Sequence, residues 1–357
     1  MMIDTSRRSF LKGAGALAAA GATGIVPMSL VTVEQANAAD TFTFAWITDA
    51  HLQQIKGTKF VSNWDNGFKR AIDEIRNMNP KPDFCYYGGD LAQQGLAAEL
   101  DHGMELWSKA GVPMKAIVGE HDYYLDMGEA ARRIYGIPAD NYSFDHKGVH
   151  FVALNTILAA DDWLAKYASD PKQRMVEMER LDNPKGSPFR LGKEGLAWLA
   201  KDLEKVDKNT PVIVFSHSPI QKIFAGWNFW TEDAEEIQAL LQPFKRSTVL
   251  YNHVHQPQAN QIGNIAFLSN FSTAWPWPYP NTYTQAPNAL PTLILPMNRA
   301  DIANFRDATG WTFINTNGGD KFEADLIGFD NPTRKVTWDG KFKDVGDTTP
   351  IAAQMHY

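Results

Sequence analysis

The stretch Phe42-Thr43-Phe44-Ala45-Trp46-Ile47-Thr48-Asp49-Ala50-His51 indicates the fold class of this chain. Its first part is apolar and alternating, which predicts a short β-strand, and its second part is a polar cluster with an Asp-x-His spacing. In open α/β sheets, ligands bind beyond the carboxyl ends of the strands. If other strands end in the same way, we expect their polar clusters to converge on one site.

Four more predicted strands end in such a cluster: 83–87 before Gly88-Gly89-Asp90, 114–118 before Gly119-Glu120-His121-Asp122, 212–215 before Ser216-His217-Ser218-Pro219, and 249–251 before Asn252-His253-Val254-His255. Five of the nine histidines lie in these clusters. A lone buried histidine is usually a hydrogen-bonded core residue, so one cluster by itself would indicate little. The ordered set predicts a site built from imidazoles and carboxylates.

The segments between these strands complete an α/β pattern. Apolar residues at helical spacing predict helices at about 68–78, 96–110 and 195–206, and hairpins are predicted at 142–154 and 324–338. Two stretches resemble additions to this core. Residues 158–190 form a long charged insertion, and residues 275–291 form a loop rich in proline and aromatic residues that leads into a β-rich tail.

The N-terminus carries an export signal. Ser6-Arg7-Arg8-Ser9-Phe10-Leu11-Lys12 places paired arginines before a mildly apolar run that ends near Val31, and Ala36-Asn37-Ala38 offers the small-x-small pattern of a cleavage site. We expect export by the twin-arginine machinery to the periplasm, with cleavage near Ala38. A membrane anchor is the alternative, but the run is short and Pro27 interrupts it, so we expect no stable anchor.

Composition restricts the partners. The chain has 34 basic and 41 acidic side chains, a net charge of −7, and an acidic surface disfavours nucleic acid. Cys85 is the only cysteine, so intramolecular disulfides are excluded and a metal site must use histidine and carboxylate ligands. The sequence does not indicate an oligomeric state.

The ordered clusters resemble the calcineurin-like metallophosphoesterase superfamily, which includes purple acid phosphatases and class III cyclic-nucleotide phosphodiesterases. The resemblance runs from about Phe42 to Ser272 and includes the segment 149–156 and the helix that contains Trp198. It implies a four-layer αββα sandwich of two mixed sheets flanked by helices. We expect a signal peptide at 1–38, a catalytic domain at 40–275 with an insertion at about 158–190, and a Pro/aromatic loop and β-rich C-terminal extension, 276–357, packed on the same domain.

The resemblance also implies residue roles around two metal ions. The ligands would be Asp49, His51 and His255 for the first ion, His217 and His253 with residue 120 for the second, and Asp90 as the bridge between them. His121 would be the general acid or a phosphate-binding group, and Asp122 would orient its ring. Imidazole and carboxylate suit Fe, Mn or Zn, and an iron-containing trivalent/divalent pair is also compatible. A metal-bridging hydroxide would attack the phosphate ester of a small phosphorylated substrate.

Two positions depart from the family pattern. The fifth motif usually begins with Gly, where this chain has Asn252; the change costs little if the turn needs a left-handed residue, because Asn tolerates that region. The third motif is usually Gly-Asn-His, where this chain has Glu120. A ligating Glu120 makes the centre less positive, which could favour a trivalent ion, favour a singly charged diester over a monoester, or weaken hydrolysis. Alternatively Glu120 points elsewhere, and the second ion has one ligand fewer.

Several readings stay open. The rival function is a catalytically weak protein of the cell envelope that binds metal or a phosphorylated ligand; the His121-Asp122 pair argues against it.

The aromatic stretches 227–230 and 275–280 form either a wall beside the metals or stiff surface loops. The insertion's Asp161, Asp162, Glu177 and Glu179 are expected to be solvated. No role is assigned to the remaining histidines, His102, His146, His150 and His356.

Overall fold

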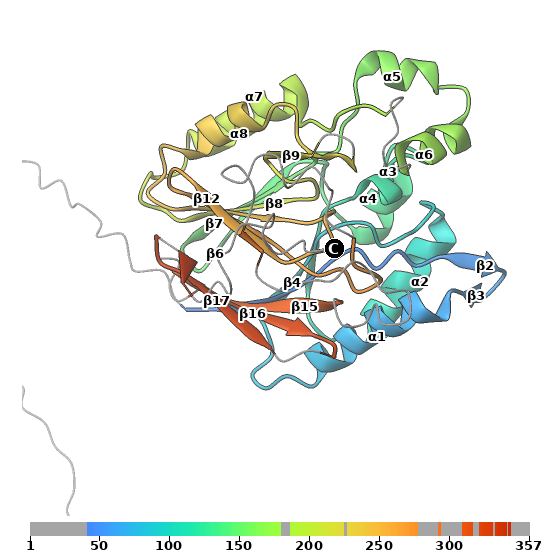
Figure 1. Cartoon of the computed structure of the whole chain (residues 1–357), viewed down its shortest axis with the longest axis horizontal. Coiled ribbons are helices and arrows are strands. Elements are labelled where there is room, and N and C mark those ends of the chain that lie inside the picture. The colour runs from blue at the N-terminus through green and yellow to red at the C-terminus, as the bar shows by residue number, and fades with distance from the viewer. Residues whose placement is uncertain are drawn as a thin grey trace, which may run out of the picture. The chain divides into compact units, whose positions relative to one another are not determined.

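The computed structural model of the chain describes residues 41–179, 186–224, 227–277, 292–293, 309–316, 321–330, 333–340 and 342–343. These residues form two seven-stranded mixed sheets, packed face to face, with helices on the outer face of each sheet (Figure 1). The α/β class and the αββα layering predicted from the sequence are therefore confirmed.

The first sheet has the strand order β18-β17-β16-β15-β1-β4-β5. Its parallel part consists of β1 (Thr43–Ile47), β4 (Phe84–Tyr87) and β5 (Met114–Ala116). Its antiparallel part consists of β15 (Gly310–Asn315), β16 (Phe322–Gly328), β17 (Arg334–Trp338) and β18 (Phe342–Lys343). Helices α1 (Ser62–Arg76) and α2 (Ala97–Trp107) cover its outer face. The predicted hairpin at 324–338 is confirmed, and β15 pairs directly with β1, so the C-terminal strands complete this sheet.

The second sheet has the order β14-β12-β13-β11-β8-β7-β6. Its strands are β6 (Tyr142–His146), β7 (Val149–Leu154), β8 (Val212–Ser216), β11 (Ser247–Tyr251), β12 (Gln258–Ile262), β13 (Ile265–Ser269) and β14 (Thr292–Leu293). Its outer face is covered by α7 (Gly192–Leu203) and α8 (Ala234–Leu241). The hairpin predicted at 142–154 is the β6–β7 pair.

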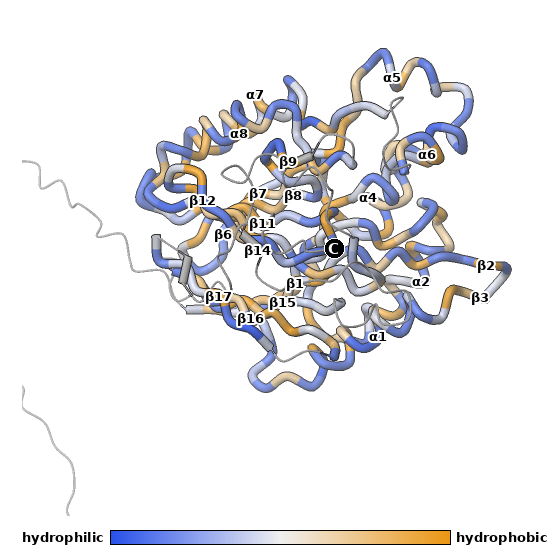
Figure 2. Tube along the Cα trace, in the orientation of Figure 1, coloured by the Kyte–Doolittle hydropathy of each residue, from blue (hydrophilic) through white to orange (hydrophobic). Residues whose placement is uncertain are grey.

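The layering follows from strands whose two faces are both apolar. In β1, Phe44 and Trp46 point into the core between the sheets, whereas Ala45 and Ile47 point into the core under α1 and α2. A third core lies between the second sheet and helices α7 and α8. Figure 2 shows hydrophobic residues concentrated along the inner strands and hydrophilic residues over the outer loops. Consecutive residues of one strand thus supply two layers of packing.

Smaller elements surround this core: the hairpin of β2 (Gln54–Lys56) and β3 (Lys59–Phe60), the helices α3 (Glu120–Tyr123) and α4 (Glu129–Tyr135), and the pair β9 (Lys222–Phe224) and β10 (Phe229–Trp230). No helix among the described residues has the length and apolarity needed to cross a bilayer.

The charged insertion is not a solvated stretch throughout. It forms α5 (Asp161–Lys166) and α6 (Pro171–Glu179). Asp161 and Asp162 are exposed as expected, but Glu177 is buried and Glu179 is half-buried, which corrects the expectation for these two. The physical reason is that α6 packs against α3, so one face of a charged helix lies next to the third motif.

Candidate metal centre

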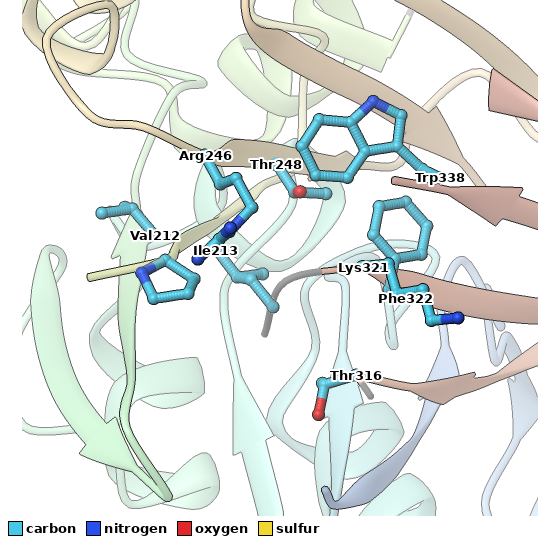
Figure 3. A pocket seen from close by; sticks show the side chains of 9 residues that line it. Val212, Ile213, Arg246, Thr248, Thr316, Lys321, Phe322 and Trp338 are labelled. Carbon is cyan, nitrogen blue, oxygen red and sulfur yellow. The ribbon is translucent and has the colours of Figure 1, made fainter. Parts of the chain in front are cut away.

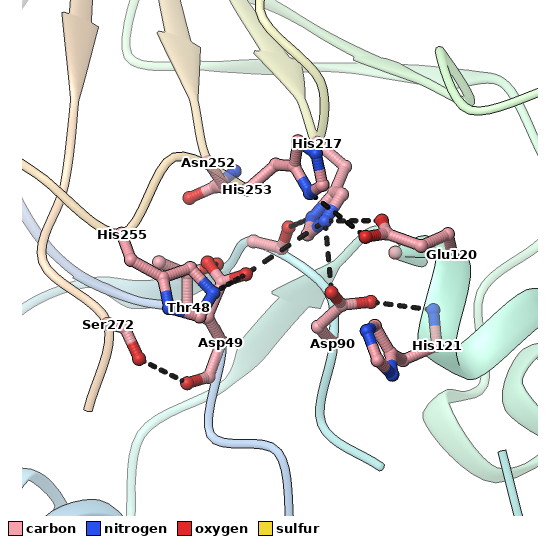
Figure 4. A network of polar contacts seen from close by, with 12 residues as sticks. Thr48, Asp49, Asp90, Glu120, His121, His217, Asn252, His253, His255 and Ser272 are labelled. Atoms are coloured by element: carbon pink, nitrogen blue, oxygen red, sulfur yellow. Dashed lines mark hydrogen bonds and ion pairs between the residues drawn. The ribbon is translucent and has the colours of Figure 1, made fainter. Parts of the chain in front are cut away.

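The polar clusters meet at the carboxyl ends of β1, β4, β8 and β11, together with α3 after β5 (Figure 4). Three groups of buried side chains have ligand atoms within 4.8 Å of one another: Asp49, His51 and His255 form the first group, Asp90, Glu120, His217 and His253 form the second, and His51, Asp90 and His121 form a third that overlaps both. The seven residues that the sequence predicted as ligands are therefore brought together in two adjacent groups.

In the first group, His255 Nε2 lies 3.1 Å from Asp49 Oδ1 and 3.1 Å from His51 Nε2. Each ring has its other nitrogen engaged, since Nδ1 of His255 contacts the Trp275 carbonyl at 2.7 Å and Nδ1 of His51 contacts Gln93 Oε1 at 2.9 Å. Rings that donate through Nδ1 present the lone pairs of Nε2 to each other. Two facing lone pairs repel, and a cation between them removes the repulsion.

In the second group, the Glu120 carboxylate lies between two imidazoles. Its Oε2 is 2.9 Å from His217 Nε2, and its Oε1 is 2.9 Å from His253 Nδ1. Glu120 therefore points into the second group and not away from it. Asp90 joins the groups, because its Oδ2 is 3.3 Å from His217 Nε2 and 3.8 Å from His51 Nε2.

Four atoms at the centre of these groups are buried but make no hydrogen bond to the described part of the chain: Asp49 Oδ1, Asp90 Oδ2, Glu120 Oε2 and His217 Nε2. Several lie within 3.3 Å of a neighbour, so distance is not what prevents the bonds. Buried polar atoms without partners are rare and costly, and bound cations are the usual explanation for such a donor set. The residues present thus fit metal ions.

Backbone carbonyls hold most of the histidine rings from behind. His217 Nδ1 contacts the Gly88 carbonyl at 2.7 Å, and His253 Nε2 contacts the Trp227 carbonyl at 3.0 Å. A carbonyl accepts a proton from one ring nitrogen and so leaves the opposite nitrogen as an acceptor for metal. These contacts therefore fix the orientation of each ring, and of its free nitrogen, before any ion binds. These carbonyl contacts were not predictable from the sequence, because any residue type can supply a backbone carbonyl.

The backbone at five of these positions is left-handed. Asp49, His51, Asp90, His253 and His255 have φ of 52°, 46°, 54°, 67° and 51°. This conformation costs an L-residue with a side chain about 1–2 kcal/mol, and such strain gathers at functional sites. The turns after β1, β4 and β11 thus direct these five side chains towards the common centre at the expense of local stability.

The expectation for Asn252 is corrected. The left-handed residues of the fifth motif are its two histidines, not Asn252. The Asn252 amide instead accepts from Trp46 Nε1 at 2.8 Å and donates to Tyr86 Oη at 2.7 Å and to the Ser216 carbonyl at 2.8 Å. It packs against Gly88, where an added Cβ would clash with the Asn252 amide. The side chain therefore ties the two sheets together beneath the site.

The third motif is arranged differently from the prediction. Asp122 does not contact the His121 ring: its Oδ1 accepts from the Ala92 N–H at 2.9 Å and its Oδ2 accepts from the Gly119 N–H at 3.2 Å. The His121 Nδ1 contacts the Gln93 carbonyl at 2.6 Å and lies 3.7 Å from Glu179 Oε2. Consecutive helical residues point in different directions, which explains why a neighbour in sequence does not orient the ring. Glu179, from the insertion, supplies the nearby carboxylate that the sequence did not reveal.

Charge balance within the site follows from these contacts. Burial would raise the pKa of Glu120, but the neighbouring His253 and His217 lower that pKa well below its usual value. Burial would lower the pKa of His217, yet Asp90 and Glu120 raise it well above the usual value. Burial together with the neighbouring His121 and His255 lowers the pKa of His51. The neighbouring charges therefore favour the ionised form of Glu120 and the protonated form of His217, whereas His51 is held neutral.

Other sequence features lie outside the centre. His102, His146 and His150 each contact an aspartate, at 2.9, 2.7 and 2.8 Å, and His356 lies outside the described residues. A separate hollow between the sheets, at the opposite ends of β8 and β11, is lined by residues including Arg246, Phe322 and Trp338 (Figure 3). Its volume of about 10 Å³ is at the lower limit for one water molecule, so it cannot hold a substrate.

Comparison with known proteins agrees with this geometry. Residues 42–257 match the model of the calcineurin-like phosphoesterase family, and residues 4–24 match the twin-arginine translocation signal sequence. A 3′,5′-cyclic-nucleotide phosphodiesterase of Nostoc sp. is 21% identical over 239 residues, which are 65% of this chain and 78% of that protein.

Two solved structures share the fold. A dimetal phosphatase from Danio rerio has a TM-score of 0.54 at 14% identity, covering 84% of this chain and 99% of that one. A purple acid phosphatase from yellow lupin has a TM-score of 0.54 at 16% identity, covering 83% of this chain and 53% of that one. The family match spans more than half of the chain and all the strand-end clusters. The chain therefore belongs to the calcineurin-like phosphoesterase family and is a metal-dependent phosphoesterase with a twin-arginine signal sequence.

Proposed function

We propose that the chain hydrolyses a phosphate ester at a binuclear metal centre. Asp49, His51 and His255 would hold one ion, Glu120, His217 and His253 would hold the other, and Asp90 would bridge them. The observation that carries this proposal is the position of the unpartnered Asp90 Oδ2, which lies 3.8 Å from a nitrogen of the first group and 3.3 Å from a nitrogen of the second. Imidazole with carboxylate suits Fe, Mn or Zn, including a mixed-valence iron pair.

When bound, two such ions activate water and polarise the phosphoryl group. The protein's own contribution is to position and to supply protons. Burial would lower the pKa of His121, but the neighbouring carboxylates of Asp90, Glu120 and Glu179 raise it to about 9, which favours the protonated ring. A protonated ring at this position would donate a hydrogen bond to a phosphoryl oxygen or a proton to the leaving group. Asp122 would hold the loops that carry Asp90 and His121, through the Ala92 and Gly119 amides.

The Glu120 carboxylate supports a preference for diesters over monoesters. It adds a third buried carboxylate to those of Asp49 and Asp90, and this charge repels a dianion more than a monoanion. The distant relative from Nostoc sp. is named a phosphodiesterase, in line with the proposal. A small phosphorylated molecule suits the acidic chain better than nucleic acid.

We place this activity in the periplasm. The twin-arginine signal implies the twin-arginine export machinery, which carries folded proteins. Cleavage near Ala38 and the boundaries at 40–275 and 276–357 remain predictions. Cell fractionation and N-terminal sequencing of the mature protein test the location and the cleavage site together.

The activity is tested on the mature protein, purified from the exported fraction and reconstituted separately with Fe, Mn and Zn. Methyl 4-nitrophenyl phosphate and 4-nitrophenyl phosphate report diester and monoester hydrolysis. We expect turnover that requires metal and disappears in Asp90→Asn. Bound metal without turnover of either ester, under every metal, would overturn the hydrolase proposal.

A second candidate is a catalytically weak protein that binds metal or a phosphorylated ligand in the cell envelope. The observation that favours it is Glu120, because an extra negative charge weakens the Lewis acidity of the centre. This candidate predicts that inorganic phosphate binds to the metal-loaded protein while ester turnover stays at the background rate.

A further inference from the structure

The two aromatic stretches that the sequence left unassigned both reach the metal centre. Trp275 and Trp277 follow β13, and Trp227 precedes β10, and all three side chains are half-buried. The Trp275 ring lies over His51 with centroids 4.3 Å apart, and the Trp277 ring lies 5.5 Å from His255. They belong to the site and are not merely surface loops.

The backbone explains why these indoles lie there. The Trp275 carbonyl contacts His255, and the Trp227 carbonyl contacts His253, at 2.7 and 3.0 Å. The Trp277 carbonyl accepts from Gln256 Nε2, next to His255, at 2.8 Å. Each loop is thus anchored by main-chain contacts beside a metal ligand. Since the backbone carbonyl anchors the loop, any residue type could make this contact. The anchoring therefore does not explain why the side chain is a tryptophan.

The rings form one continuous wall along both ligand groups, which we call the aromatic wall and define as Trp64, Trp275, Trp277 and Trp227. Neighbouring centroids along it are 4.7, 6.1 and 6.4 Å apart. Phe229 then links Trp227 to His253, with centroid distances of 5.7 and 5.4 Å. The wall therefore starts beside the first group and ends beside the second.

Indole rings that are only half-buried expose part of their apolar surface, beyond the contacts they make with one another. Trp64 is half-buried on α1, like the other three members of the wall. Planar rings bind aromatic faces by offset stacking or edge contacts, which an aliphatic chain cannot match. A metal centre that takes the phosphoryl group would place the rest of the ester next to these rings.

Resting on the proposed hydrolysis, we propose that the aromatic wall binds a planar aromatic group of the phosphate ester. The substrate class would be a small phosphate ester that carries an aryl ring or a nucleobase. The wall acts in binding, so its contribution is to affinity, and it is separable from the chemistry at the metals.

Calorimetry with three non-hydrolysable probes tests this without any need for turnover. Methylphosphonate, hexylphosphonate and phenylphosphonate are titrated into the metal-loaded mature protein. We expect phenylphosphonate to bind about tenfold more tightly than methylphosphonate, with hexylphosphonate clearly weaker than phenylphosphonate. Equal binding of methyl- and phenylphosphonate would overturn the wall and leave the phosphate site standing. Equal binding of the hexyl and phenyl probes would overturn the aromatic assignment.

Binding of none of the three would overturn the phosphate site itself, and this inference with it. Trp277→Ala should reduce the phenyl-to-methyl ratio to about twofold, and Trp277→Phe should restore most of it. Trp198→Ala is the matched control, because Trp198 is a half-buried tryptophan on α7 in the outer core. If Trp277→Ala does not fold, Trp64→Ala on α1 replaces it. An unchanged ratio in a folded wall variant with full metal content would contradict the proposal.

Discussion

Replacing Glu120 by Asn should raise the rate of monoester hydrolysis relative to that of diester hydrolysis. The Glu120 oxygens lie 2.9 Å from His217 Nε2 and 2.9 Å from His253 Nδ1, so the carboxylate charge lies between two proposed ligands of the second ion. A unit charge about 5 Å from another, at an effective dielectric of about 20, contributes about 3 kcal/mol. A dianionic monoester carries one more negative charge than a monoanionic diester. Removal of the Glu120 charge therefore relieves one more such repulsion for the monoester than for the diester. Water and the ions screen this, which leaves a ten- to hundredfold change in the ratio.

The assay compares kcat/KM for 4-nitrophenyl phosphate and methyl 4-nitrophenyl phosphate at pH 8, where the monoester is a dianion. Two variants separate charge from shape, because Glu120→Gln removes the charge at constant size and Glu120→Asn introduces the residue usual in the family. We expect the monoester-to-diester ratio to rise in both. Metal content is measured in parallel by elemental analysis. An unchanged ratio in variants that retain both ions would refute the electrostatic reasoning.

Three further outcomes are expected. His121→Asn should lower kcat by about 10²- to 10⁴-fold with metal content retained; steady-state kinetics with elemental analysis checks this, and a normal kcat would contradict it. Asp122→Asn should cost about 1–3 kcal/mol in urea unfolding, because an amide –NH₂ would face the backbone N–H of Ala92 or Gly119; wild-type stability would count against this role. Burial would raise the pKa of Asp83, but ion pairs lower it below its usual value, so its stabilisation is present above about pH 4 and is lost as the pH falls. Asp83→Asn should therefore cost up to about 1 kcal/mol at pH 7 and progressively less below pH 4, and a pH-independent cost in unfolding experiments would exclude the ion-pair explanation.

The strands and their polar ends were predictable because their signals are local. Phe44 and Trp46 alternate with Ala45 and Ile47 along four consecutive apolar residues. Such a run predicts a strand buried on both faces, and both faces of β1 are buried. The Asp-x-His and His-x-His spacings likewise come from single turns. Local periodicity gives a strand but not its partner, so the pairing of β1 with β15, far along the chain, was not predictable.

Contacts within the site were harder to predict for the same reason. The family resemblance implied that Asp122 orients the His121 ring, but adjacent positions on a helix diverge. Glu179 reaches the His121 ring only because α6 packs on α3. The tryptophan carbonyls behind His253 and His255 leave no trace in residue identity. Tertiary packing, rather than motif spacing, decided each of these.

We propose that seven buried side chains hold two metal ions, with Asp90 joining them. Anomalous diffraction from crystals of the metal-loaded mature protein, collected at the absorption edge of the bound metal, tests it most directly. We predict two peaks, one among Asp49, His51 and His255 and one among Glu120, His217 and His253, with Asp90 between them. A single peak, or peaks away from these residues, would contradict the proposed binuclear centre.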